Sequence, residues 1–135
     1  MKEQMLTLIK NSKDYTLSVA NDMPEESYDF KPAENVMSFK DQLNHLAYGI
    51  TWYEENYLKR NKTSWEPPET KGKKKDFVKR LDNAYESITG TIKNLKINDD
   101  HIKGFYAALD HITHHRAQAV VYLRCKGIVP PEYIY

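Results

Sequence analysis

The chain has 135 residues and a mass of 15.9 kDa, a length that predicts a single domain over residues 1–135. Its 20 basic and 19 acidic side chains argue against nucleic acid as a partner, because phosphate binding requires a concentrated positive surface. No run of 18 apolar residues occurs, so we expect no membrane partner. The charged N-terminus lacks the apolar centre of a signal peptide, and the single cysteine, Cys125, favours the cytoplasm.

The first half of the chain contains two stretches with apolar residues at helical spacing. The first covers residues 2–21 and ends where Asn21-Asp22 precedes Pro24. The second begins at a capping-box-like pair, Ser38 and Asp41, and runs to about residue 60. Its expected buried stripe consists of Phe39, Leu43, Leu46, Ile50, Tyr53 and Tyr57.

The second half contains two more such stretches. A loop over residues 61–72 precedes a third helix over about 74–96, and a fourth covers about 100–126, capped at Asn98-Asp99-Asp100 and ended by Gly127. The stripe of the fourth helix consists of Phe105, Leu109, Ile112, Ala119 and Leu123. Four helices of about 20 residues predict an all-α fold, an antiparallel four-helix bundle, with an elongated pair of α-hairpins as the alternative.

Four of the five histidines lie within fifteen residues of the fourth helix. His111 and His115 are separated by four residues, which places them on one helix face with Cβ atoms about 5–6 Å apart. At about 100° per residue, both lie roughly 80–120° to one side of the buried stripe. His114 points nearly opposite the stripe, and we expect His101, in the first turn, to be exposed.

His45, the one histidine outside the fourth helix, falls on the corresponding flank of the second helix. If the two flanks meet, three imidazoles can bind one divalent metal ion and leave a coordination position for water or substrate, as in catalytic sites. The alternative is structural: an H-x-x-x-H pair also occurs by chance in helices, and a lone helical histidine is often only a half-buried polar residue.

Other side chains near these flanks are candidates for the surroundings of the site. Gln118 and Tyr122 share the flank of His111, and Trp52 that of His45. Arg116 lies near the centre of the buried stripe, where it either finds a carboxylate or several carbonyls or extends its charged end to solvent. Cys125 lies in the last turn of its helix, where the helix dipole disfavours a thiolate, so we expect an unreactive, half-buried thiol.

Residues 109–133, LDHITHHRAQAVVYLRCKGIVPPEY, resemble the C-terminal signature of the DinB/YfiT-like metal-binding superfamily. That signature reads approximately H-x-x-x-H-R-G-Q, followed by an apolar stretch, L-R, a glycine and two prolines. Residues 28–53, YDFKPAENVMSFKDQLNHLAYGITWY, are similar to the second helix of the superfamily and its approach. The sequence departs from the pattern at Ala117, where glycine is usual, and in a short connection at residues 96–100.

The resemblance implies an up-down-down-up four-helix bundle that commonly forms a homodimer. It also implies zinc, nickel or iron held by His45, His111 and His115, with Trp52, Arg116, Gln118 and Tyr122 around the pocket. Characterised members include S-transferases and isomerases that use a low-molecular-weight thiol such as bacillithiol, mycothiol or glutathione.

Three functions follow as hypotheses. The first is a metal-dependent thiol S-transferase acting on a small electrophilic substrate. The second is a metal-dependent hydrolase, for which Asp41 and Asp110 are the carboxylates nearest in sequence to the histidines. The third is a stress-related metal-binding module without catalytic activity, which the short connection at residues 96–100 favours because shortening it removes part of a substrate pocket.

Overall fold

A computed structural model describes all residues, 1–135, and confirms the predicted all-α four-helix bundle. Its long helices are α1 (Lys2–Asp22), α2 (Phe39–Tyr53), α3 (Lys74–Asn94) and α4 (Asp99–Cys125). A 3-10 turn, η1 (Glu25–Ser27), lies between α1 and α2, and a π-turn, η2 (Glu54–Leu58), directly extends α2. None of the helices combines the length and apolarity that crossing a membrane requires.

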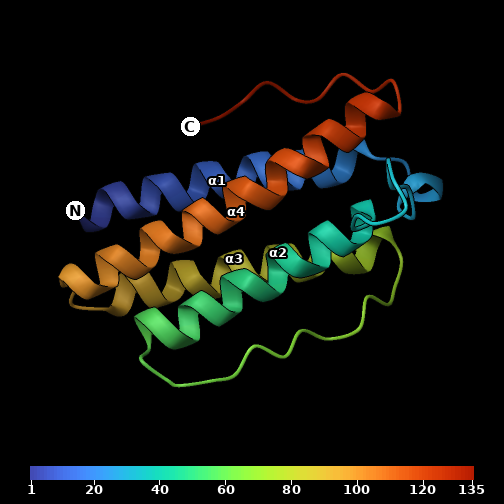
Figure 1. The fold of residues 1–135 in the computed structure, drawn as a ribbon. Coiled ribbons are helices and arrows are strands. Elements are labelled where there is room, and N and C mark those ends of the chain that lie inside the picture. The colour runs from blue at the N-terminus through green and yellow to red at the C-terminus, as the bar shows by residue number, and fades with distance from the viewer.

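The helices form two layers, α1 with α4 and α2 with α3 (Figure 1). Helices α2 and α3 run parallel, because Asn44 pairs with Arg80 near their first turns and Glu54 pairs with Ser87 and Thr91 near their ends. The expected antiparallel arrangement is therefore wrong for this pair, and the order is up-down-down-up. As a consequence, the connection from η2 to α3 returns along the length of the bundle (Figure 1).

Local sequence signals fix where α2 and α4 begin. Ser38 accepts a hydrogen bond from the Asp41 amide at 3.2 Å, and the Asp41 carboxylate accepts one from the Ser38 amide at 3.1 Å. Asn98 caps α4 in the same reciprocal way with His101. The expectation that His101 is exposed is wrong: its ring folds back to accept a hydrogen bond from the Asn98 amide, which leaves the residue only 6% exposed.

The buried stripe of α2 shifts by one residue at the π-turn. Glu54 and Leu58 are buried, whereas Tyr57, expected in the core, is 43% exposed. A π-turn accommodates one more residue per turn than an α-helix, so the residues after Tyr53 rotate relative to the predicted face. The buried Glu54 carboxylate accepts hydrogen bonds from the hydroxyls of Ser87 and Thr91 at 3.0 and 2.6 Å, and thereby joins η2 to α3.

Arg116 is buried in the core and points toward α1. Its Nη1 donates to the Ser12 hydroxyl at 3.3 Å and to the Thr16 hydroxyl at 3.4 Å, and its guanidinium lies over the rings of Tyr15 and Tyr133. Neither expected alternative is fully right, because the side chain meets no carboxylate and does not extend to solvent. Hydroxyls and aromatic faces stabilise this cation instead.

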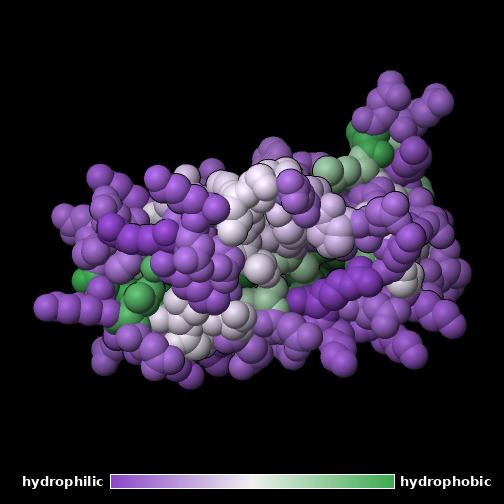
Figure 2. All heavy atoms as spheres, turned by 90° about the horizontal axis from the view of Figure 1, so that it is seen from below, coloured by the Kyte–Doolittle hydropathy of each residue, from purple (hydrophilic) through white to green (hydrophobic).

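The surface is mainly hydrophilic on the side where the long connection runs. Figure 2 shows this face, seen from below, with hydrophilic residues over much of it, a band of near-neutral residues across its middle and hydrophobic residues at a few places. The large buried side chains, such as Tyr85, Phe39, Phe77 and Phe105, belong to one core cluster shared by all four helices.

Two glycines give a matched test of packing. A Cβ at Gly104 would lie 2.9 Å from Tyr57 Cγ, whereas one at Gly90 would meet nothing within 4 Å. We expect Gly104→Ala to lower the free energy of unfolding by about 1–3 kcal/mol through overpacking. Gly90→Ala should raise it by about 0.4–1 kcal/mol, because it restricts the unfolded chain without a clash. Urea denaturation of both variants measures the difference, and equal stabilities would contradict the close approach of η2 and α4.

Candidate metal centre

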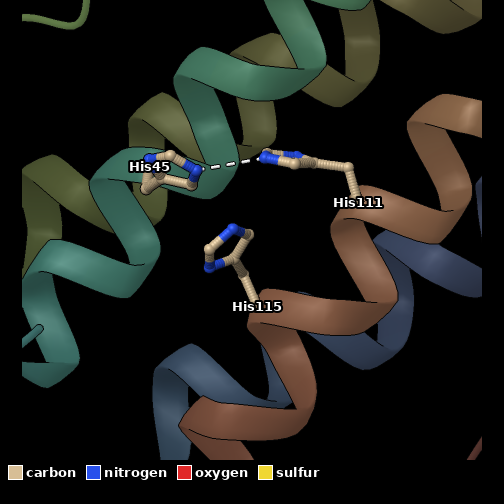
Figure 3. Close-up of side chains that lie close together, drawn as sticks. All are labelled: His45, His111 and His115. Carbon is tan, nitrogen blue, oxygen red and sulfur yellow. Dashed lines mark hydrogen bonds between the residues drawn. The ribbon is translucent and has the colours of Figure 1, made fainter. Parts of the chain in front are cut away.

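His45 from α2 and His111 and His115 from α4 converge in the space between the two helices (Figure 3). One ring nitrogen of each lies within 4.8 Å of the others, and Nε2 of His45 is 3.0 Å from Nε2 of His111. All three side chains are half-buried. The flanks predicted for these histidines therefore do meet, and no carboxylate or thiol joins the cluster.

The close approach of α2 and α4 depends on Gly49. A Cβ at this position would overlap Cε1 of His111 and lie 2.7 Å from its Nδ1. The His111 imidazole thus occupies the space that a side chain at position 49 would fill. His45, one turn earlier on α2, then lies opposite the pair on α4.

The environment keeps all three imidazoles neutral. Burial, followed by the charges of neighbouring histidines, lowers the pKa of His111 to about 4 and that of His115 to about 3. Burial and the charge of His114 also lower the pKa of His45. Because only neutral imidazole has a free lone pair, these shifts favour metal ligation over protonation near neutral pH.

Gln42 orients His115. Nδ1 of His115 donates to Oε1 of Gln42 at 2.8 Å, so the other ring nitrogen, Nε2, keeps its lone pair for a ligand. Nε2 of Gln42 in turn donates to Oε1 of Gln118 at 2.7 Å and lies 3.5 Å from the Tyr122 hydroxyl. Gln118 therefore fixes the orientation of the Gln42 amide rather than contacting a histidine of the cluster itself.

Trp65 lies beside the cluster, on the connection between η2 and α3. Its ring centroid is 5.2 Å from that of His45 and 6.0 Å from that of His111. Neither Trp65 nor Gln42 is among the site residues that the sequence predicts. Gln42 precedes His45 by three residues, and this helical spacing places the two side chains on one face of α2. No comparable spacing in the sequence indicates where a single tryptophan in a loop lies.

The other candidate residues surround the cluster at greater distance. Trp52 packs against Trp65 rather than a histidine, and its buried Nε1 has no hydrogen-bond partner. The Tyr122 hydroxyl donates to the Met37 carbonyl at 2.8 Å. Arg116 faces α1 and contacts none of the three histidines, which is a correction to its expected place beside the pocket. Cys125 is exposed and not half-buried.

A groove of about 550 Å³ opens beside His111. Tyr53 and Asp110 line it together with Ala107, Thr113, His114 and Ala117. The groove gives a small molecule access to one edge of the histidine cluster. Of the two carboxylates considered as bases, Asp110 lies in this groove, whereas Asp41 is engaged in capping α2 through Ser38.

The donor set fits a divalent transition metal. Two nitrogens that each bind one zinc ion at about 2.0–2.1 Å lie about 3–3.5 Å from each other. The distance of 3.0 Å between Nε2 of His45 and Nε2 of His111 is at the lower end of this range. At most one hydrogen lies between these two nitrogens, and Nε2 of His115 has no hydrogen-bond partner. A cation would satisfy these lone pairs, and imidazole ligands suit zinc, nickel, iron and copper.

A sequence model of the DinB family matches residues 1–102. The chain belongs to the DinB family. The matched residues include His45 and end in the first turn of α4, so His111 and His115 lie beyond them. No curated protein matches the sequence.

The fold of this DinB-family chain is also similar to a crystal structure. A DinB-like protein from Bacillus subtilis, YjoA, superposes with a TM-score of 0.78 over 97% of this chain and 98% of that chain. At 19% sequence identity this likeness shows the shared fold alone.

The role of Gly49 can be tested by adding one methyl group. We expect Gly49→Ala to weaken zinc binding by at least roughly tenfold, because the Cβ displaces the His111 ring from the cluster. Competition with a chelating dye measures the affinity, and far-UV circular dichroism checks that the helices remain. Gly90→Ala is the matched control and should bind zinc as the wild type does. Unchanged affinity in Gly49→Ala would refute this role.

The role of Gln42 can be separated from that of Gln118. We expect Gln42→Met to weaken zinc binding by about 10–100-fold, because His115 loses the acceptor that fixes its tautomer. Gln118→Met should cost less, since it contacts only Gln42 in this chain of bonds. Nitrogen-15 NMR of the metal-free variants should show a mixed His115 tautomer only in Gln42→Met. Equal losses in both variants, with an unchanged tautomer, would contradict the assignment.

Proposed function

We propose that the chain binds a divalent metal ion, zinc, nickel or iron, through His45, His111 and His115. The convergence of three neutral, half-buried imidazoles with no fourth protein ligand is the observation that carries this proposal. A site with three protein ligands keeps a coordination position for a small molecule, in contrast to a closed structural site. The groove beside His111 supports access to that position.

For the reaction we propose a thiol S-transferase, in which a low-molecular-weight thiol of the bacillithiol or glutathione type displaces a leaving group from an electrophilic substrate. When bound, the metal supplies Lewis acidity that lowers the pKa of the thiol. The protein holds the site in shape: Gln42 keeps Nε2 of His115 available, and Gly49 leaves room for His111. Trp65 and the groove around Tyr53 limit what can approach.

Two observations favour thiol transfer over hydrolysis. Hydrolysis by a water nucleophile benefits from a protein base, but the Asp41 carboxylate already accepts hydrogen bonds from Ser38. Asp110 is exposed in the groove and forms no hydrogen bond with the cluster. A thiol bound as thiolate needs no such base for its attack.

We also propose that the protein acts as a homodimer in the cytoplasm.

Elemental analysis of protein purified without a histidine tag tests the metal. We expect roughly one ion per chain in the wild type and its loss in His45→Ala and His111→Ala, because two imidazoles hold the ion far less tightly than three. Absence of metal after reconstitution would refute the site.

Consumption of a thiol in the presence of an electrophilic haloarene tests the reaction. This consumption should require the metal and should fall to background in His115→Ala.

Three outcomes separate the candidate activities. Consumption of thiol at the wild-type rate by His115→Ala would refute the transferase. Metal-dependent ester hydrolysis without added thiol would favour the hydrolase instead. Stoichiometric metal with neither activity would favour a metal-binding module without catalysis.

A further inference from the structure

Both tryptophans of the chain lie together at the histidine cluster. Trp65 approaches the rings of His45 and His111, and its centroid is 5.5 Å from that of Trp52 and 4.8 Å from that of Tyr48. Trp65 nevertheless remains 40% exposed. Part of the indole is therefore free to contact a molecule that reaches the histidines.

Side chains of α2 and η2 fix the position of Trp65. They hold the connection on both sides of Trp65 through hydrogen bonds. These bonds join Asn44 Nδ2 to the Pro68 carbonyl (3.0 Å), Tyr48 Oη to the Glu66 amide (2.7 Å) and Asn56 Nδ2 to Thr63 Oγ1 (2.7 Å). Trp52 of α2 also packs against Trp65. The loop is thus built to place an indole beside the imidazoles.

Tyr53 bounds the cluster at the groove. Its ring centroid is 5.4 Å from that of His111, and the ring stacks on Tyr57 at 5.5 Å with an interplanar angle of 22°. Tyr53 therefore borders His111 on the groove side, and Trp65 borders the rings of His45 and His111.

The side chains around the cluster offer no cationic partner to an anionic group of a ligand. No lysine or arginine forms an ion pair, a hydrogen bond or a cation–π contact with the three histidines, Trp52, Trp65 or Tyr53. The nearby formal charges are carboxylates, Asp110 in the groove and Glu66 beside Trp65. Away from the metal ion, an anionic group of a ligand would meet no cationic side chain among these contacts, whereas an uncharged ring gains contact with aromatic faces.

We propose that Trp65 and Tyr53 form an aromatic wall that selects ligands carrying an uncharged aromatic ring at the histidine site. This inference rests on the proposed function, because it assigns the substrate class of the same site. It places the aromatic group of the substrate beside Trp65, and it assigns no anion-binding role to the surroundings of the histidines.

Cobalt(II)-loaded protein tests this wall by absorption spectroscopy. Benzyl mercaptan, 2-mercaptoethanol and 2-mercaptoethanesulfonate are titrated separately and give the affinities for an aromatic, a small neutral and an anionic thiol. We expect benzyl mercaptan to bind roughly tenfold more tightly than 2-mercaptoethanol, and the sulfonate to bind most weakly. In Trp65→Leu the preference for the aromatic thiol should fall to about twofold or less, while Trp65→Phe should keep part of it.

Tyr106→Ala is the matched control, since Tyr106 is a comparably exposed aromatic residue that contacts none of the three histidines. It should keep the wild-type preference, and far-UV circular dichroism of all variants checks the fold. A preference unchanged in Trp65→Leu overturns the proposal. Binding of the sulfonate as tightly as benzyl mercaptan also overturns it.

A second ligand pair, imidazole and 4-phenylimidazole, separates this inference from the proposed thiol function. If no thiol binds the cobalt protein but 4-phenylimidazole binds more tightly than imidazole in a Trp65-dependent way, the thiol function fails and the aromatic wall stands. If thiols bind without an aromatic preference, the wall fails and the thiol function stands. If cobalt or every ligand fails to bind, both fail.

Discussion

The contact between Gly49 and the His111 imidazole is the constraint on which the site depends. Because Gly49 has no Cβ, α2 and α4 approach closely enough for an imidazole from one helix to fill the space beside the backbone of the other. Successive turns of α2 then each contribute one residue to the site: Gln42 orients His115, His45 provides a ligand nitrogen, and Gly49 leaves space for the His111 ring. The site is thus a property of one interface between two antiparallel helices.

The parallel arrangement of α2 and α3 has a second consequence for the same site. Two parallel neighbours cannot be joined by a short turn, so the connection must return along the bundle. It passes over α2, and side chains of α2 and η2 hold it by hydrogen bonds. The topology of the bundle therefore brings Trp65, on the connection that follows η2, back to the edge of the histidines. The crossover thus sets both the topology of the bundle and the aromatic surroundings of the histidines.

Much of the fold could be predicted because its signals are local. The breaks at Pro24 and Gly127 and the caps at Ser38 and Asn98 act within one helical turn, and the structure places helix ends within a few residues of them. The helical period also placed three histidines on flanks that meet. The same period wrongly predicts a buried Tyr57 at the π-turn. Glu54 is buried there instead, because hydroxyls of α3 donate hydrogen bonds to its carboxylate, and the sequence of α2 does not reveal these partners.

The sequence by itself determined the number and approximate extent of the helices, the near-balance of 20 basic and 19 acidic side chains, and the flanks that carry His45, His111 and His115. These depend on side-chain period and composition, which are read along one element at a time. Only the tertiary structure decided the parallel crossover, the bond from Gln42 to His115, the burial of Arg116 among hydroxyls and aromatic rings, and the place of Trp65. Each of these joins residues far apart in the chain, and their contacts depend on the separation of packed helices rather than on any local preference.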